Sequence, residues 1–206
     1  MKVWVTDKGL GEAPILDELK RSHEIICARD LIDLRDPGHV ERHVQGADAI
    51  LHTARSWPDD ASDETILDHA SRGTFVVAQA AVAAGIDRLC LISDLSCFGL
   101  YPDGCVIDES WRPIPGTSAG ELAPLMAERV CREFSRQHSI RSVCLRFGEL
   151  GQETSIELAS AAILKGLTAE IETDRYRWQL YHVSNTTRFP LRAAKGEPLG
   201  LEGLVT

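Results

Sequence analysis

Residues 72–99 of this 206-residue chain read RGTFVVAQAAVAAGIDRLCLISDLSCFG. Apolar residues recur with helical spacing in the first half, and Gly85 follows them as a helix C-cap. The second half contains Arg88–Ser93, a largely apolar run without polar alternation, which is typical of a strand buried on both faces of a parallel sheet. This stretch therefore predicts a helix that leads directly into a buried parallel strand.

The same alternation of short apolar runs and longer helical segments continues along the chain. The expected strands are Lys2–Thr6, His23–Ala28, Ala49–His52, Arg88–Ser93 and Arg141–Arg146, and the expected helices are Glu64–Ala84, Ala119–His138 and Ser155–Leu167. Repeated strand–helix–strand units with right-handed crossovers give a sheet with helices on both faces. We therefore predict an α/β fold, a doubly wound parallel sheet of the Rossmann-like type.

The pattern changes near residue 150. Residues 1–150 hold the strand–helix repeats of the expected Rossmann-like domain. Residues 151–206 hold one helical segment, the strand-like run WQLYHV at Trp178–Val183 and a tail rich in Gly and Pro. We expect this part to be a short C-terminal appendage, a remnant of a substrate-binding region that packs on the same domain.

Charge limits the partners that we expect. The chain has 22 Lys and Arg residues against 31 Asp and Glu residues, a formal net charge of -9, and no run of Lys or Arg offsets it. An acidic surface repels nucleic acid and anionic lipid, so we expect neither as a partner. No apolar run reaches the roughly 20 residues that span a bilayer, and the start MKVWVTDKGL has no leader pattern, which favours a cytoplasmic protein.

The six cysteines predict neither a disulfide framework nor a metal centre. Cys27, Cys90 and Cys144 lie inside strand-like runs, where a small apolar thiol is ordinary core filling. No Cys or His pair has the spacing of zinc ligands. We expect reduced, structural cysteines and no metal site.

Several motifs together resemble the extended short-chain dehydrogenase/reductases, the NAD-dependent epimerase/dehydratase group. In chain order they include VWVTDKGLG (3–11), GADAILHTA (46–54), the stretch 72–99, VCLRFGELG (143–151) and SIELASAAILKGL (155–167). The resemblance implies a Rossmann-like fold, NAD or NADP as cofactor, and a small molecule or nucleotide as ligand. It also implies a homodimer, for which Phe75, Val76 and the stretch 125–130 form the candidate face.

The turn that holds the cofactor diphosphate departs from the family pattern. Family members carry T-G-x-x-G-x-x-G here, because glycines let the backbone touch the diphosphate at a helix N-terminus. Residues 6–13 read TDKGLGEA, so Asp7, Leu10 and Ala13 take the three glycine positions. The side chains crowd the phosphates and Asp7 adds like charge. Either the turn no longer binds phosphate, or Gly9 and Gly11 form a displaced turn that binds it weakly.

The resemblance also assigns contacts at the adenine end of the cofactor. Arg29 stands where the family often has an acidic residue for the ribose, and an Arg there favours the 2′-phosphate of NADP. Asp33 and Leu34 match the pair that contacts adenine. The full set of candidate cofactor-binding residues is Thr6, Lys8, Gly9, Gly11, Arg29, Asp33, Leu34, His52, Thr53 and Ala54.

The family's acid/base residues are missing from this sequence. Family chemistry uses a Tyr phenol, a Lys four residues later that lowers the phenol pKa, and a Ser or Thr on the same oxygen. The motif register puts Gly120 at the Tyr position and Pro124 at the Lys position, and Asp94 replaces the Ser or Thr. The chain contains no Tyr-x-x-x-Lys at all, so this pair is absent whatever the register.

Other side chains are candidates to replace it. Asp94 follows a parallel strand and points toward the crevice where such sheets bind ligands, and Ser93 and Ser96 are its neighbours. We name these three as candidate catalytic residues, although each also has an ordinary structural explanation. The residues that could converge on them are His52, Arg55, His69, Cys97 and Glu149. Cys97 would be a nucleophile only if its thiol pKa were lowered.

Three functional hypotheses follow, and enzyme status stays open among them. The first is an epimerase/dehydratase-like protein that binds NAD(P) or a nucleotide and uses a substituted catalytic set. The second is a catalytically silent nucleotide sensor or partner-binding scaffold. The third is a cofactor-independent enzyme that uses the crevice around Asp94. The short C-terminal part favours a small ligand over a large nucleotide sugar.

Overall fold

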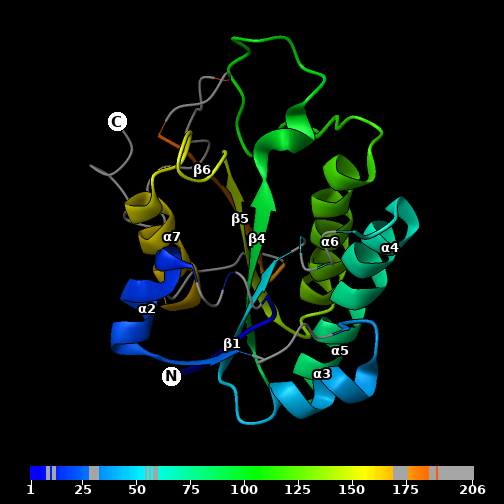
Figure 1. Cartoon of the computed structure of the whole chain (residues 1–206), viewed down its shortest axis with the longest axis vertical. Helices are drawn as coiled ribbons and strands as arrows, with labels where there is room; N and C mark the ends of the chain where they lie inside the picture. The colour runs from blue at the N-terminus through cyan, green and yellow to red at the C-terminus, as the bar shows by residue number, and fades with distance from the viewer. Residues whose placement is uncertain are drawn as a thin grey trace.

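The computed structural model describes residues 1–7, 10, 13–27, 33–53, 55, 57, 60–168, 176–185 and 189. These residues form three layers, with one parallel sheet between two layers of helices (Figure 1). The predicted doubly wound, Rossmann-like sheet is confirmed.

All neighbouring strands of the sheet pair in parallel, in the order β2-β1-β3-β4-β5-β6. The strands are β1 (Lys2–Val5), β2 (Glu24–Cys27), β3 (Ala49–Thr53), β4 (Arg88–Asp94), β5 (Arg141–Phe147) and β6 (Trp178–Val183). The chain crosses from β2 over β1 to β3, so the strand order reverses at β1 and β3. Such a reversal opens a crevice at the carboxyl ends of the strands.

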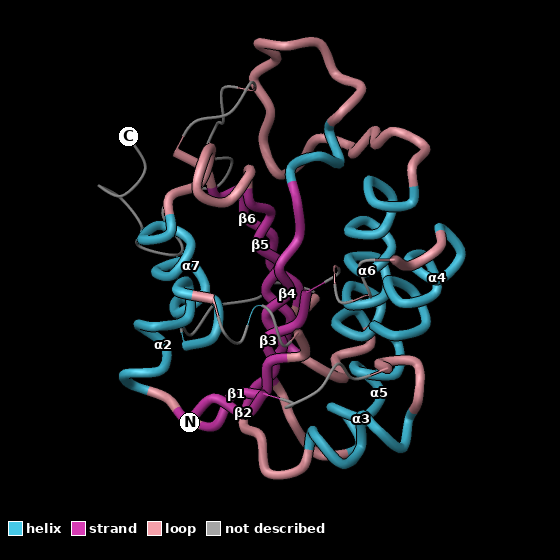
Figure 2. The backbone as a smooth tube through the Cα atoms, in the orientation of Figure 1, coloured by secondary structure: helices cyan, strands magenta, loops and turns pink. Residues whose placement is uncertain are grey.

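Helices cover both faces of the sheet (Figure 2). One face carries the 3-10 turn η1 (Pro14–Leu16), α2 (Asp17–Ser22) and α7 (Ile156–Thr168), and the other carries α3 (Pro37–Val44), α4 (Asp63–Asp68), α5 (Thr74–Ala83) and α6 (Ala119–Arg136). Because successive side chains of a strand point to opposite faces, the sheet builds two cores. Val3 and Leu51 pack toward α7, whereas Trp4 and Ile50 pack toward α3, α5 and α6.

The sheet continues beyond residue 150. The predicted helix at Ser155–Leu167 and strand at Trp178–Val183 are confirmed as α7 and β6. β6 pairs with β5 along its whole length, from Ser142↔Trp178 to Phe147↔Val183.

The expected helix Glu64–Ala84 is confirmed as an unbroken helical segment from Asp63 to Ala83, but it is not α-helical throughout. A π-helical turn, η2 (His69–Gly73), separates α4 from α5. Gly73 passes so close to the loop after β2 that a Cβ there would lie 3.3 Å from the Leu34 Cβ. The apolar periodicity of the sequence does not show such a local change of helix type.

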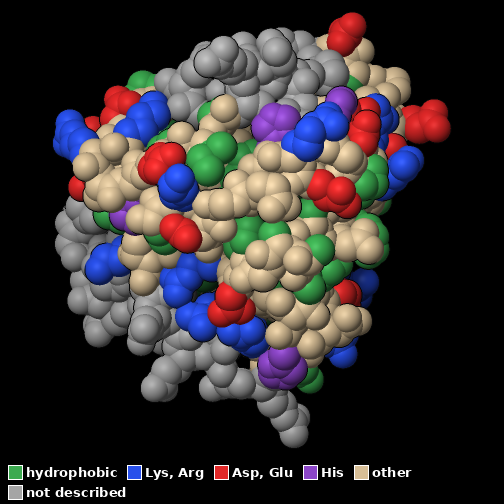
Figure 3. Space-filling model, turned by 90° about the horizontal axis from the view of Figure 1, so that it is seen from below, with side chains coloured by type: hydrophobic (Ala, Val, Ile, Leu, Met, Phe, Trp, Pro, Cys, Tyr) green, Lys and Arg blue, Asp and Glu red, His purple; other side chains and the backbone are tan. Residues whose placement is uncertain are grey.

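On the face drawn in Figure 3, the acidic side chains are not gathered into one patch. Seen from below, at the face opposite the direction in which β4 points, acidic and basic side chains are interspersed (Figure 3). No helix among the described residues is long and apolar enough to cross a membrane. The candidate dimer face is partly covered, because Val76 is buried while Phe75 is exposed and packs edge-on against Phe134. Dimer formation stays a prediction.

Candidate functional site

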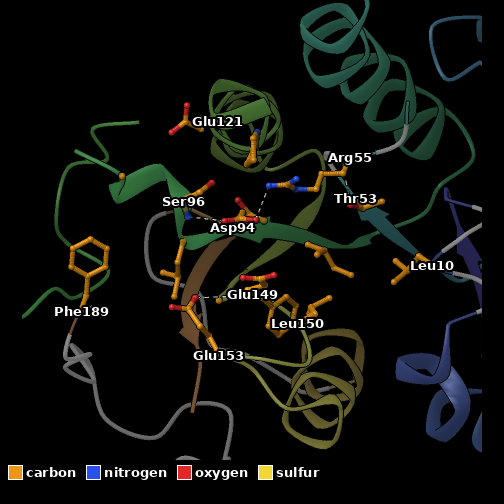
Figure 4. A pocket seen from close by; sticks show the side chains of 17 residues that line it. Leu10, Thr53, Arg55, Asp94, Ser96, Glu121, Glu149, Leu150, Glu153 and Phe189 are labelled. Atoms are coloured by element: carbon orange, nitrogen blue, oxygen red, sulfur yellow. Dashed lines mark hydrogen bonds and ion pairs between the residues drawn. The ribbon is translucent and has the colours of Figure 1, made fainter. Parts of the chain in front are cut away.

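A crevice of about 640 Å³ lies at the carboxyl ends of β3, β4 and β5, beside the reversal of strand order (Figure 4). It combines apolar side chains with many polar ones, and a volume in this range suits a small-molecule ligand. The polar side chains that line it are those of Thr53, Arg55, Ser93, Asp94, Ser96, Glu121, Glu149 and Glu153. The structure thus brings together all three catalytic candidates, with Thr53, Arg55 and Glu149 beside them.

Asp94 builds the crevice wall with both of its carboxylate oxygens. Oδ1 accepts a hydrogen bond of 2.6 Å from the backbone N–H of Ser96 and caps the 3-10 turn η3 (Leu95–Phe98). Oδ2 accepts a hydrogen bond of 2.8 Å from Nη2 of Arg55, whose side chain is 53% exposed. Asp94 therefore orders the loop after β4 and holds Arg55 at the crevice.

The two serine candidates differ in their hydrogen bonds. Ser93 Oγ donates to Glu128 Oε1 at 2.5 Å. Ser96 Oγ is buried without a hydrogen-bond partner among the described residues, although Ser96 lines the crevice. A buried hydroxyl without a partner is costly, so Ser96 is the candidate with capacity to bind a ligand.

A buried ion pair lies behind Ser93. Glu128 on α6 accepts from Nε of Arg146 at 2.8 Å and from Nη2 at 2.6 Å, and both side chains are at most 5% exposed. Burial acts to lower the pKa of Arg146, but the hydrogen bonds and charge of Glu128 outweigh it and the pKa is raised. This pair was not predicted from the sequence. Its only signal was a Glu between Pro124 and Cys131, two buried residues on the inner side of α6.

His182 on β6 continues this network. Its Nε2 lies 3.3 Å from Nη1 of Arg146, and its backbone N–H donates to Glu109 at 3.1 Å. Burial, and then the charge of Arg146, lower the pKa of His182 to about 3. The ring is therefore neutral at ordinary pH, and the network carries one positive and one negative charge at its centre.

The crevice itself is strongly acidic. Figure 4 shows Glu121 on the α6 side and Glu149 and Glu153 on the α7 side, with Asp94 and Arg55 between them. Four carboxylates and one guanidinium among the described lining residues give a local charge of -3. Glu149 accepts from Gln152 at 2.6 Å and Glu153 accepts from the Glu149 backbone at 3.0 Å, so neutral groups hold both carboxylates in place.

The α6 wall lies where the family pattern expects Tyr and Lys. Pro124 lines the crevice, and a Cβ on Gly120 would meet no heavy atom within 4 Å. Among the described residues that line the crevice there is no Tyr, Lys or His. Of the described α6 residues that line the crevice, Glu121 is the one that can titrate.

His52 is a core residue and lies outside the crevice lining. Its ring bridges two hydroxyls, with Nδ1 2.9 Å from Thr6 Oγ1 and Nε2 2.9 Å from Thr74 Oγ1. Burial lowers the pKa of His52 to about 4, so the neutral ring joins β1, β3 and α5. The neighbouring Thr53 does line the crevice, and its Oγ1 accepts from the Arg55 N–H at 3.3 Å.

The described part of the phosphate turn does not fit a diphosphate. The backbone N–H of Leu10 donates to Asp7 Oδ1 at 2.7 Å, so a carboxylate already accepts from the turn. The Leu10 side chain lines the crevice. A diphosphate would have to displace the Asp7 carboxylate and lie against its charge. The predicted contacts Lys8, Gly9, Gly11, Arg29 and Ala54 lie outside the described residues.

The adenine-end residues also have partners within the chain. Arg35 donates to both oxygens of Asp33, at 2.8 and 2.9 Å, and these hydrogen bonds lower the Asp33 pKa to about 2. His69 Nε2 lies 3.7 Å from Asp33, so His69 belongs to this cluster and does not line the crevice. Leu34 is 1% exposed and packs in the core.

The remaining candidates have no catalytic geometry. Cys97 is fully buried, and burial raises its thiol pKa to about 12, the opposite of what a nucleophile needs. All six cysteines are free thiols. No group of three or more His, Cys, Asp or Glu side chains in the described part of the chain could hold a metal ion.

Comparison with known proteins agrees with the fold and the motif order. A model of the NAD dependent epimerase/dehydratase family matches residues 7–174. The chain belongs to this family. Within the family, it is 28% identical over 149 residues to a UDP-glucose 4-epimerase from Rhizobium meliloti (strain 1021). That alignment covers 66% of this chain and 44% of the relative, so it spans less than half of the relative's length.

Solved structures of low identity share the fold of this family member. A mutated uronate dehydrogenase is 18% identical with a TM-score of 0.78, covering 97% of this chain and 80% of that one. A uronate dehydrogenase from Agrobacterium tumefaciens is 16% identical with a TM-score of 0.76, covering 97% and 83%. A UDP-glucuronic acid 4-epimerase from Bacillus cereus, solved in complex with NAD, is 14% identical with a TM-score of 0.68, covering 91% and 79%.

Proposed function

We propose that this family member binds a small polar ligand of neutral or positive charge in the crevice and does not transfer hydride with a Tyr–Lys pair. The observation that carries the proposal is the composition of the crevice wall. Glu121 and Pro124 line it on α6, and four carboxylates face a single guanidinium. A phenol whose pKa is lowered by a neighbouring ammonium has no counterpart there.

Weak or absent dinucleotide binding is the second part of the proposal. The Asp7 carboxylate accepts the Leu10 N–H in the turn that family members use for phosphate. Two like charges at about 4 Å repel by roughly 4 kcal/mol at an effective dielectric of 20, before screening by salt. Two structures that share this fold were solved in complex with NAD. The family pattern has a glycine, which carries no carboxylate, at the position of Asp7.

The sign of the crevice charge selects the ligand. A local charge of -3 favours a protonated amine and disfavours a carboxylate such as that of a uronic acid. Ser96 Oγ offers a hydroxyl without a partner among the described residues, which suits a polyhydroxylated molecule. Asp94 uses both oxygens in the wall, so we assign it to positioning and not to proton transfer.

Three sugars of similar shape and different charge test the ligand class. We expect calorimetric titration to give saturable binding in the order glucosamine, then glucose, with no binding of glucuronate. Stronger binding of glucuronate than of glucosamine would contradict the proposal. Glu121→Gln and Glu153→Gln should each weaken glucosamine binding about tenfold, because each removes one carboxylate that attracts the ammonium group of the ligand. Glu157→Gln, at an exposed site on α7, is the matched control and should have no effect.

Titration with NADH and NADPH tests the cofactor part separately. We expect no saturable change of nicotinamide fluorescence up to millimolar concentration. Asp7→Gly should then increase cofactor binding, because it frees the Leu10 N–H and removes the carboxylate. Submicromolar binding by the unaltered chain would disprove the assignment, and a preference for NADPH would implicate Arg29.

A further inference from the structure

A second hollow, of about 320 Å³, lies further along α6 than the crevice, where Leu125, Glu128, Arg129 and Arg132 line it. Three segments far apart in the sequence build it, namely the stretch 109–113, one side of α6 and the edge of the sheet at β5 and β6. We call it the basic pocket and define it by Trp111, Arg112, Arg129, Arg132 and Trp178 above the Glu128–Arg146 pair.

The charge of the basic pocket is opposite to that of the chain. Four Arg and two Glu side chains line it, so the local charge is +2 in a chain whose formal net charge is -9. Arg146 is neutralised by Glu128, and Glu109 accepts from the His182 backbone. The surplus positive charge therefore belongs to the arginines at the rim.

Three rim arginines have no neutralising partner. Arg112, Arg129 and Arg132 are exposed, and none of their guanidinium groups makes a hydrogen bond or ion pair with another described residue. Arg129 and Arg132 are three residues apart on α6, a spacing at which like charges repel and destabilise the helix. Guanidinium groups that line one hollow and are not paired with a carboxylate provide paired donors for the oxygens of a phosphate.

The walls of the basic pocket add flat apolar surfaces. Trp178 begins β6 and packs against the core, and Trp111 is held by an edge contact with Tyr101 at 5.2 Å. Both indoles are half-buried, so they are ordered but still present surface to the hollow. Indole rings beside guanidinium groups suit a ligand that carries a planar ring next to its anionic group.

We propose that the basic pocket binds a small phosphorylated ligand that carries a flat ring. The rim arginines hold the phosphate, and the two Trp side chains contact the ring. The volume is at the lower end of small-molecule sites, which fits a phosphate ester of one ring and excludes a dinucleotide. This site is separate from the crevice and does not depend on the function proposed for it.

Phenyl phosphate, inorganic phosphate and phenol are the probes that test the site by calorimetry. Phenyl phosphate should bind most tightly, inorganic phosphate more weakly and phenol not measurably. Binding should weaken as salt is raised, because exposed charges are screened. The proposal is overturned if phenol binds as well as phenyl phosphate, if inorganic phosphate binds as well as the ester, or if the ester shows no saturable binding at millimolar concentration.

Variants locate the binding. Arg129→Gln and Arg132→Gln should each weaken phenyl phosphate binding about tenfold or more, since each removes a charge-assisted hydrogen bond. Arg55→Gln is the matched control at the crevice and should leave the affinity unchanged. All three side chains are exposed, so none of the variants should unfold at a lower temperature than the unaltered chain. A loss in Arg55→Gln without a loss in the α6 variants would place the anion in the crevice and overturn the proposal.

Discussion

The crevice and the basic pocket lie at successive stretches of α6 and have opposite charge. The crevice has four carboxylates and one Arg among its described lining residues, and the basic pocket has four Arg and two Glu. One helix contributes to both, with Glu121 in its first turn and Arg129 and Arg132 further along. The Glu128–Arg146 pair lies between the two hollows and bonds to Ser93 in the crevice wall.

This contrast teaches that net charge does not decide what a chain can bind. The sequence has no run of Lys or Arg, and on that ground it predicts no local basic site. Folding brings Arg112, Arg129, Arg132 and Arg146 together from three segments. An acidic protein can therefore keep a confined anion site, because screening limits the reach of its other charges to about 10 Å.

Breaking the buried pair between the two hollows should have the largest effect. Arg146→Met leaves the Glu128 carboxylate buried without its partner, and removal of one member of such a pair costs about 3–5 kcal/mol. Urea unfolding at neutral pH measures the loss. The double variant Arg146→Met with Glu128→Gln should recover much of it, since no unpaired charge then remains. A loss below about 1 kcal/mol in the single variant would mean that water reaches the pair.

Acid should destabilise the fold through two histidines, one behind each hollow. The folded-state pKa of His52 is about 4 and that of His182 about 3, below the usual value of 6.5. The folded protein then binds fewer protons than the unfolded chain, so stability is full above pH 6.5 and falls as pH drops toward 4. His52 alone accounts for about 3 kcal/mol by pH 4.

Urea unfolding at several pH values tests this. His52→Gln should reduce the slope of stability against pH by about one proton between pH 6.5 and 4, whatever its effect at pH 7. Asp33 serves as an internal reference. Its pKa of about 2 lies below the usual 3.8, so its stabilising effect is lost only at lower pH. Equal slopes for the unaltered chain and His52→Gln would show that the pKa of His52 is the same in the folded and unfolded states, and would contradict the prediction.

Pro124→Ala sharpens the comparison at the crevice side of α6. Pro124 lies inside the helix and has no N–H to donate to the carbonyl of Gly120. Alanine restores that hydrogen bond, so we expect a gain of about 1–3 kcal/mol in the free energy of unfolding. Calorimetric unfolding measures it. Ligand preference by charge should not change, because the four carboxylates stay; a reversed preference would contradict the electrostatic explanation.

The exposed ion pair of the crevice should matter least for stability. Arg55→Met removes the partner of Asp94, but the Arg55 side chain is half exposed and such pairs contribute less than about 1 kcal/mol. The same unfolding assay used for Arg146→Met gives a direct comparison of the two arginines. A loss similar to that of the buried pair would show that Asp94 and Arg55 hold the loop after β4 together.

The sequence predicts the fold well because its signals are local. Apolar runs and helical periods gave all six strands, Gly85 has the positive φ of 74° expected of a C-cap residue, and α6 begins at the expected Ala119. α3 was not predicted, although Asp36 caps it through Gly38 and His39 and Pro37 follows as the first helical residue. The helix has only 8 residues, which are too few to show a clear helical spacing of apolar side chains.

The site was predicted only in part, because its chemistry depends on distant contacts. Motif register correctly put Asp94, Ser93 and Ser96 at one crevice. No pattern in the sequence shows that Ser93 bonds a residue 35 positions away, or that Glu128 pairs with a residue 18 positions away. The hydrogen bond between Leu10 and Asp7 is local. Asp side chains in turns often accept from the backbone N–H a few residues later, so Asp7 is a signal that could have predicted this bond.

The Glu128 carboxylate has a further consequence, because its Oε1 accepts from both Ser93 and Arg146. An acceptor oxygen shared in this way couples its two donors, because whatever draws the Arg146 guanidinium away leaves more of the oxygen's charge to the Ser93 hydroxyl. By thermodynamic linkage, an effect of the guanidinium on the hydroxyl implies an equal effect of the hydroxyl on the guanidinium. α6 carries the Glu128 carboxylate that links the two hollows, so a ligand that changes the Arg146 hydrogen bond also changes the Ser93 hydrogen bond.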